Sequence, residues 1–338
     1  MARRSKHRHR SSSFGSASLL DADTIEGVAA DRTERLERIY HLAHHRAWDG
    51  KKVLAELLAR HGGIHVSPEH RTSIARVFSI ILWGELAAWS VSAELAERID
   101  DVEAKMAATA QTFDEARHFY TMRDYLRVLD VPVPPLDSYT RLVLRELLAT
   151  ESLAYKLVGM QLLVENAALA IFKMVARARV EPVLSDLMPY FEKDEARHVG
   201  LGVNYLPALL ADLSTWEIVK LNAFQGHVYT MLFWDTMLLL EDFDRLGLDA
   251  NESTRFSLRL QLDIATQMGK FARDSTRRRE GRGVWVEPEL IRRTHSFSVD
   301  AFMPHPGTKI PAWQRTLLGA AGRVARVGAR AFDLVDPA

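Results

Sequence analysis

The sequence predicts an all-α protein built around a four-helix bundle, with additional N- and C-terminal helices. Apolar residues recur at helical spacing over most of the chain, and no segment shows a strong strand pattern. The pentamer Asp-Glu-Ala-Arg-His occurs at 114–118 and again at 194–198. Thirty residues before the glutamate of each copy lies another glutamate in an apolar setting. We interpret the two segments as one duplicated helical hairpin.

The duplicated hairpin contributes six side chains that are expected to meet. Residues i and i+3 share one face of a helix, so each Glu-x-x-His directs a carboxylate and an imidazole the same way. A turn midway along each hairpin, near Asp100-Asp101 and near Val180-Pro182, brings its two glutamates to the same height. The predicted metal ligands are Glu85, Glu115, His118, Glu165, Glu195 and His198.

Such a buried set of charges needs a compensating cation, because bare buried charges cost several kcal/mol each. The chain has no Cys, and oxygen and imidazole ligands suit a pair of Fe or Mn ions. The ligand pattern resembles that of ferritin-like di-iron carboxylate proteins: one Glu from each of two helices, and Glu-x-x-His from each of the other two. The alternative interpretation is a pair of solvated, salt-bridged surface helices, which two copies with apolar upstream glutamates disfavour.

Composition narrows the class of protein. Lys and Arg together number 44, as do Asp and Glu, so no global field favours nucleic acid, and no such partner is expected. The absence of Cys fits a reducing interior. Residues 1–15 are basic and Ser-rich with no apolar run behind them, unlike a secretory signal. We therefore expect a cytoplasmic protein whose residues 1–30 form a disordered basic tail.

The core helices are justified by their apolar faces and their end signals. Residues 31–60 are predicted to be helical around Asp49-Gly50, and a linker follows. Val131-Pro135 ends the second core helix, and residues 137–150 are predicted to return the chain along the bundle. The four core helices are expected at about 72–98, 101–129, 151–177 and 182–210.

Further helices are expected after the core, at 215–245, 252–273 and 313–334. The first contains the apolar run Val228–Leu240, a candidate wall of a substrate pocket, but its polar residues argue against a transmembrane span. The last is basic and amphipathic, and its contact with a membrane or a partner stays open. The expected division is a tail (1–30), a ferritin-like di-metal helical domain (31–276, core helices about 72–210), and an irregular segment with a C-terminal amphipathic helix (277–338).

The two pentamers also resemble the Asp-Glu-x-Arg-His motifs of bacterial multicomponent monooxygenase hydroxylases, and more loosely those of class I ribonucleotide reductase small subunits. In such proteins the Asp accepts a hydrogen bond from a ligand His, and the Arg steadies the Asp. The resemblance therefore implies this supporting role for Asp114, Arg117, Asp194 and Arg197. Met122 occupies the place of the radical-bearing Tyr of the reductase subunits, so no tyrosyl radical is expected there.

The resemblance implies a di-iron centre, or a Mn/Fe centre, that reduces O2 and oxidises organic substrates. We therefore expect an O2-dependent oxygenase or oxidase acting on an apolar or amphipathic substrate, with no catalytic residue beyond the metal ligands. No Gly-rich nucleotide loop or other cofactor-binding motif occurs, so a ferredoxin or flavin reductase would supply electrons. A homodimer is one option for its assembly. The alternatives are a ferroxidase or other iron-handling protein, and a metal-bound structural or regulatory bundle.

Overall fold

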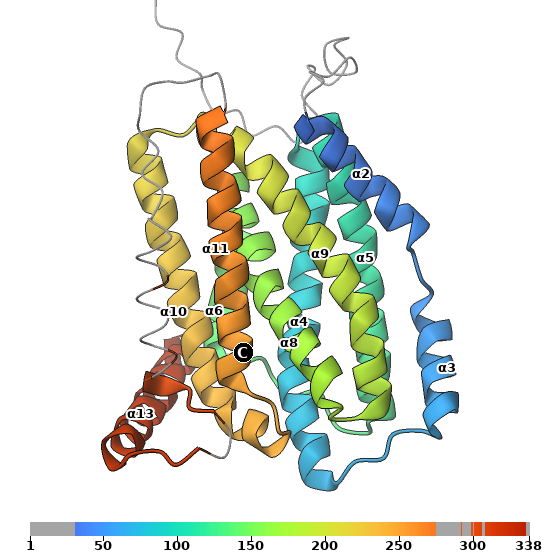
Figure 1. The fold of residues 1–338 in the computed structure, drawn as a ribbon, viewed down its shortest axis with the longest axis vertical. Coiled ribbons are helices and arrows are strands. Elements are labelled where there is room, and N and C mark those ends of the chain that lie inside the picture. Colours follow the sequence, from blue (N-terminus) through green and yellow to red (C-terminus); the bar gives the residue numbers. More distant parts are fainter. Residues whose placement is uncertain (1–30, 275–291, 293–298, 300, 306–307, 336–338) are drawn as a thin grey trace, which may run out of the picture.

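The computed structural model describes residues 31–274, 292, 299, 301–305 and 308–335. The predicted tail 1–30, and most of the predicted irregular segment after residue 276, lie outside this part. Within it every regular element is helical, which confirms the predicted all-α class (Figure 1). The elements are α2 (Asp31–His45), α3 (Gly50–His61), α4 (Pro68–Arg98), α5 (Val102–Val128), α6 (Ser138–Ala149), α7 (Leu153–Lys156), the π-helix η2 (Leu157–Val164), α8 (Glu165–Ala178), α9 (Pro182–Ala211), α10 (Thr215–Arg245), α11 (Ala250–Asp274) and α13 (Ala312–Val335).

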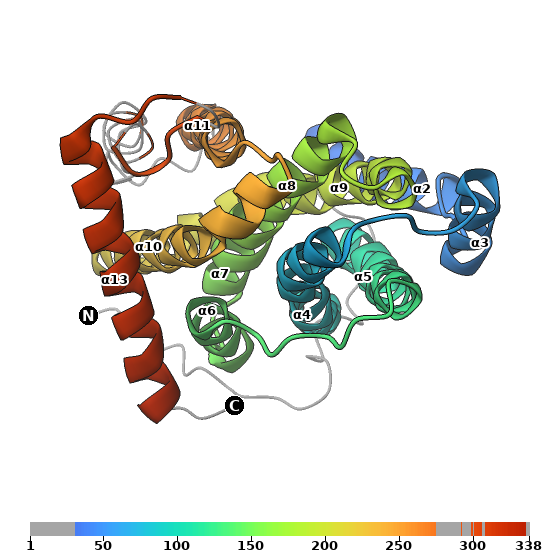
Figure 2. The same ribbon diagram turned by 90° about the horizontal axis from the view of Figure 1, so that it is seen from below.

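Four long helical segments form the bundle: α4, α5, the continuous α7–η2–α8 segment, and α9. The first two pack as one hairpin, and α8 and α9 pack as the second. Helix α6 lies between the hairpins in sequence and contacts α4 and α10. Helices α2 and α3 cover α5 and α9, whereas α10 and α11 lie on the opposite side of the bundle (Figures 1 and 2).

Polar caps decide where the bundle helices begin. The Ser67 side chain accepts a hydrogen bond from the His70 N–H, and Pro68 occupies the first turn of α4. Both features favour a helix start, so α4 begins at Pro68 rather than near the predicted Thr72. Helix α5 begins after Asp101, whose carboxylate accepts from the Ala104 N–H.

The third bundle segment contains an interruption that its apolar pattern does not predict. Eight residues, Leu157–Val164, form a π-helix directly before Glu165. Close packing accompanies it: a Cβ on Gly159 would stand 2.2 Å from a methyl of Leu147. A side chain at this position would therefore push α6 away from the bundle.

The apolar core consists of two buried clusters at the two ends of the bundle. One is built around Leu95, Leu157 and Leu201, and the other around Phe78, Tyr125 and Leu187. The spans Pro68–Arg98 and Leu153–Ala178 are long and apolar enough to cross a membrane, but 61% and 67% of their most apolar windows are buried inside the fold. Burial in this core accounts for their composition.

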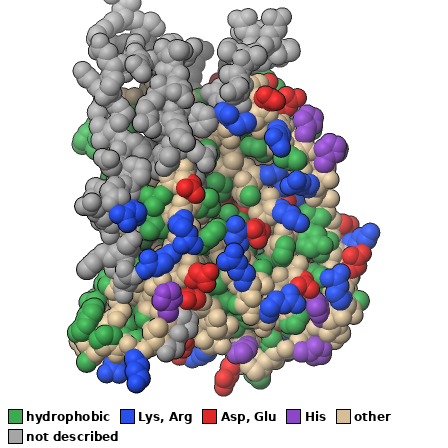
Figure 3. Space-filling model, viewed as in Figure 1, with side chains coloured by type: hydrophobic (Ala, Val, Ile, Leu, Met, Phe, Trp, Pro, Cys, Tyr) green, Lys and Arg blue, Asp and Glu red, His purple; other side chains and the backbone are tan. Residues whose placement is uncertain are grey.

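The C-terminal helix α13 lies across α6 and α10 at the edge of the molecule (Figure 2). The Tyr139 hydroxyl donates to the Ala325 carbonyl at 2.8 Å, and the Ser138 hydroxyl donates to Asp333 at 2.6 Å. One face of α13 is thus docked on the bundle, whereas Val324 and Val327 are exposed. On the face viewed in Figure 1, basic and acidic side chains of the described residues are interspersed (Figure 3), in keeping with zero net charge.

The buried cap of α9 should contribute strongly to stability. Glu181 is fully buried and accepts hydrogen bonds from the Val183 N–H (3.1 Å), the Leu184 N–H (2.7 Å) and the Tyr125 hydroxyl (3.2 Å). Glu181→Ala leaves three buried donors unpaired, and we expect a loss of about 1–3 kcal/mol of unfolding free energy in urea titrations followed by circular dichroism. Glu252→Ala, at the exposed start of α11, is the control and should change it by about 0.5 kcal/mol or less.

Candidate metal centre

All six predicted ligands converge between the two apolar clusters. They form two overlapping groups in which the candidate ligand atoms lie within 4.8 Å of one another. The first group is Glu85, Glu115, His118 and Glu195, and the second is Glu115, Glu165, Glu195 and His198. None of the six is more than 5% exposed, so the interpretation as solvated surface helices is wrong.

Two carboxylates belong to both groups. Glu195 lies 3.1 Å from Nδ1 of His118 through Oε1, and 3.1 Å from Nδ1 of His198 through Oε2. Glu115 lies 3.0 Å from Nδ1 of His198 through Oε1, and 3.6 Å from Nδ1 of His118 through Oε2. Each therefore offers one oxygen to either side, as a carboxylate bridging two ions does.

The other two carboxylates are terminal. Glu85 lies 3.3 Å from Nδ1 of His118, and Glu165 lies 3.7 Å from Nδ1 of His198. The geometry thus defines a His118 position, with Glu85, and a His198 position, with Glu165, joined by Glu115 and Glu195.

The donor atoms fit a pair of metal ions. Oε2 of Glu115, Oε2 of Glu165 and Oε1 of Glu195 are buried and have no hydrogen-bond partner among the described residues. Unpaired buried carboxylate oxygens are costly unless a cation compensates them. Carboxylate and imidazole donors without thiolate are suited to Fe and Mn.

The Asp and Arg residues of the two pentamers lie directly behind the imidazoles. Nε2 of His118 lies 3.0 Å from Asp194, and Nε2 of His198 lies 3.4 Å from Asp114. Each Asp therefore contacts the His of the other hairpin, an exchange that the sequence does not reveal. A ring N–H directed at these carboxylates leaves Nδ1 as the ligand atom and makes it more basic.

The two arginines lie between the same aspartates. Arg117 donates to Asp194 at 2.7 Å and also to Asp114, and Arg197 donates to Asp114 at 2.9 Å and to Asp194 at 2.5 Å. The four buried side chains form a closed network of two positive and two negative charges. The role that the resemblance implies for them, holding the imidazoles in place, stays a proposal with this geometry in its favour.

The protein environment shifts the acid–base behaviour of the cluster. Burial raises the pKa of Glu85 well above its usual value, and His118 opposes this rise only in part. Burial likewise raises the pKa of Glu165, against the effect of His198. Burial would lower the pKa of both imidazoles, but the surrounding carboxylates, Glu85 first for His118 and Glu115 first for His198, hold them well above normal.

The bridging carboxylate Glu115 behaves in the opposite way. Burial alone would raise its pKa, but the charge of His198 and hydrogen bonds to both imidazoles bring it below the usual range. Glu115 is therefore ionised while its neighbours hold protons.

Two neighbours of the ligands were missed by the sequence analysis. Trp48 donates from its indole nitrogen to Asp194 at 2.8 Å, and its ring stacks near that of His118 with centroids 6.2 Å apart. Gln111 donates to Glu165 at 2.6 Å and to Glu115 at 3.1 Å. Gln111 precedes Glu115 by one turn, a spacing that could have found it, whereas Trp48 lies outside the repeat.

Comparisons with protein-family models and with curated proteins find no match. Solved structures do match. A variant of an R2-like ligand-binding oxidase with an aerobically reconstituted Mn/Fe cofactor has a TM-score of 0.51 and 14% identity, over 75% of this chain and 97% of that one. A form with an anaerobically reconstituted Mn/Fe cofactor has a TM-score of 0.50 and 15% identity, over 75% and 98%. A form with an aerobically reconstituted Fe/Fe cofactor has a TM-score of 0.50 and 13% identity, over 83% and 96%. The ferritin-like bundle fold predicted from the sequence is thereby confirmed.

Metal binding should release protons. Raised pKa values mean that Glu85, Glu165, His118 and His198 hold protons to higher pH than in water, and a metal must displace them. We expect the affinity to fall as pH falls, by about tenfold per pH unit for each proton released. Calorimetry in buffers of different ionisation enthalpy measures the number, and an affinity independent of pH would contradict this picture.

The exchanged Asp–His contact should also support metal binding. Asp194→Asn removes the charge behind His118, and we expect metal affinity to fall by about 10- to 100-fold in competition with a chelator. Asp186→Asn is the matched control on α9, because Asp186 pairs with Arg179 and His61 near the surface. Equal losses in both variants would contradict a specific role for Asp194.

Proposed function

We propose that the protein is an O2-activating oxidoreductase of the oxygenase or oxidase type, using two Fe ions or a Mn/Fe pair. The observation that carries the proposal is that Glu115 and Glu195 each reach Nδ1 of both imidazoles. Two adjacent ions sharing two carboxylates would be held in this way. The likeness of the fold to R2-like oxidases with Mn/Fe or Fe/Fe cofactors supports the same reading.

The side chains divide the work. His118 and His198 would each hold one ion through Nδ1, and the two shared carboxylates would hold the ions together. The terminal carboxylates Glu85 and Glu165 would complete the ligand set and move as the charge changes. When bound, the metal pair supplies the electrons that reduce O2 and then oxidises the substrate. Burial of all six ligands keeps bulk water away from that chemistry.

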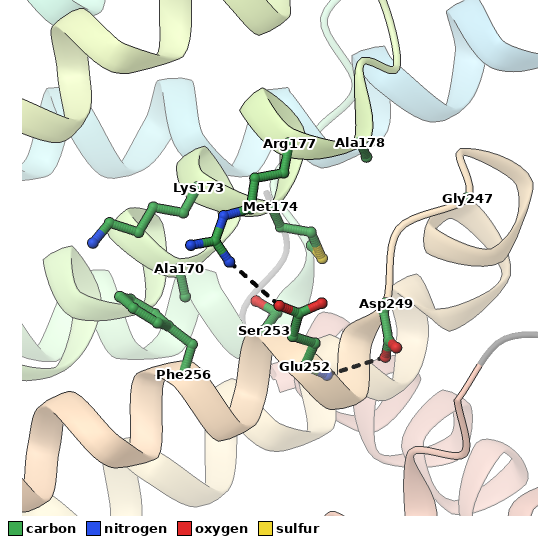
Figure 4. Close-up of a pocket in the computed structure, with 10 residues that line it drawn as sticks. All are labelled: Ala170, Lys173, Met174, Arg177, Ala178, Gly247, Asp249, Glu252, Ser253 and Phe256. Carbon is green, nitrogen blue, oxygen red and sulfur yellow. Dashed lines mark hydrogen bonds and ion pairs between the residues drawn. The ribbon is translucent and has the colours of Figure 1, made fainter.

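We propose an apolar or amphipathic substrate. Leu169 and Phe172, the residues on α8 beyond Glu165, are buried and apolar. A cavity of about 190 Å³ lies further along α8, facing α11. It combines Met174 and Phe256 with the cations Lys173 and Arg177 (Figure 4), a lining suited to an amphipathic acid. Its volume is below the roughly 300–1,000 Å³ of usual ligand pockets, and no metal-ligand residue lines it.

Several expectations remain proposals alongside this one. A ferredoxin or flavin reductase as electron donor follows from the absence of a nucleotide-binding motif in the sequence. A cytoplasmic location and a homodimer are likewise predictions. The expected pocket wall at Val228–Leu240 does not line the larger open cavity of about 660 Å³, which α10 lines through Ala223, Phe224 and His227.

Anaerobic loading with Fe(II) followed by O2 tests the proposed function. We expect two Fe per chain by metal analysis, an optical change on exposure to O2, and O2 consumption that depends on an added reductant and an apolar substrate. Glu115→Ala and Glu195→Ala each remove a shared ligand, so both metal content and optical change should be lost.

Glu192→Ala is the matched control, because Glu192 lies three residues before Glu195 and pairs with Lys173 outside the ligand set. It should keep two Fe per chain. Uptake of iron well beyond two ions per chain would favour the ferroxidase or storage alternative. Two bound ions without O2 consumption would favour a structural or regulatory bundle.

A further inference from the structure

The duplicated hairpin is not chemically symmetric around the centre. Residues 80 positions apart correspond, and the positions one turn from the ligands pair as Ile81 with Gln161, Ala88 with Ala168, Gln111 with Phe191, and Met122 with Gly202. We call Ala88, Gln111, Gln161 and Gly202 the amide layer, and Ile81, Met122, Ala168 and Phe191 the apolar layer. One end of the centre is thus lined by two carboxamides and two small residues, and the other by larger apolar side chains and one alanine.

The amide layer is tied to the His198 position. Gln111 lies four residues before Glu115 and holds Oε1 of Glu165, so that Oε2 of Glu165 is left to face the centre. Gln161 lies four residues before Glu165. A Cβ on Gly202, which lies four residues after His198, would stand 3.0 Å from Cβ of Gln161.

The amides have hydrogen-bonding capacity that the described protein atoms do not use. Oε1 of Gln111 and both polar atoms of Gln161 are buried without a hydrogen-bond partner among the described residues. Unpaired buried amides cost free energy, and their counterparts Phe191 and Ile81 avoid that cost in the same fold. Unsatisfied buried polar groups of this kind are concentrated at functional sites.

The same end of the centre is the one nearer to an opening. Gln161 lies within the π-helix η2, a type of helix often found at functional sites. A Cβ on Gly159, two residues earlier, would stand 3.3 Å from the Phe224 ring, and Phe224 lines the open cavity of about 660 Å³. On the opposite side the Phe191 ring stacks on His118 with centroids 4.5 Å apart.

We propose that the amide layer is the subsite in which a small hydrogen-bonding ligand, such as water, hydroxide or an anion of the size of azide, reaches the metal at the His198 position. Gln111 and Gln161 bind that ligand through the amide atoms that protein groups leave unpaired. The apolar layer closes the His118 position. The inference rests on the proposed di-metal centre.

Azide binding to the protein loaded with Co(II), an optical probe that needs no turnover, tests the subsite. Two Co(II) per chain must bind first; failure at this step contradicts the proposed centre itself. We then expect Gln161→Leu and Gln111→Leu to weaken azide binding by about tenfold or more, with two Co(II) retained. Ile81→Leu, the matched change in the apolar layer, should leave azide binding within about twofold.

Thermal unfolding of the metal-free protein separates a ligand subsite from a structural amide. If Gln161 serves a ligand, Gln161→Leu removes an unpaired buried amide, and the unfolding temperature should stay the same or rise. Unchanged azide binding in Gln161→Leu with two Co(II) bound would overturn the proposal. An equal loss of azide binding in Ile81→Leu, or a Gln161→Leu chain that does not fold, would overturn it as well.

Discussion

The structure depends on the mutual compensation of charges that have been taken out of water. Four glutamates, two histidines, two aspartates and two arginines lie within one small volume, each no more than 6% exposed. No single pair of them would repay its desolvation, because the cost of burying an ion is several kcal/mol. The network is tolerable only as a whole: Arg117 and Arg197 balance the aspartates, and protons or metal ions balance the glutamates. The bundle must therefore hold four helices in exact register for the charges to meet.

This constraint explains why so much was predictable from the sequence. A repeat with matched spacing places Glu85 with Glu115, and Glu165 with Glu195, at one height in two hairpins, so the residues brought together followed from helix geometry alone. The helix ends followed from prolines and caps, with α4 starting earlier because Ser67 and Pro68 act together. Whether those residues bind metal is a matter of chemistry that the geometry supports and experiment must decide.

Other features could not be predicted, for identifiable physical reasons. A π-helix has the same apolar composition as an α-helix, so nothing in Leu157–Val164 announced the change of hydrogen-bonding pattern. The partner of each aspartate depends on how two hairpins dock, which periodicity within one helix does not contain. Trp48 reaches Asp194 from a segment outside the repeat. Tertiary packing, rather than local preference, decides contacts of this kind.

The exchange of aspartates between the hairpins has a consequence for how such a molecule can arise. His118 and Asp194, like Asp114 and His198, are separated by 76 and 84 residues, and each hairpin completes the imidazole support of the other. A lone hairpin would carry both halves of this contact and satisfy neither. Two identical copies related by a twofold axis would satisfy both, because an isologous pairing makes every contact twice. The architecture is thus that of a symmetric dimer of half-length chains, fused into a single gene product and afterwards free to let its two halves diverge.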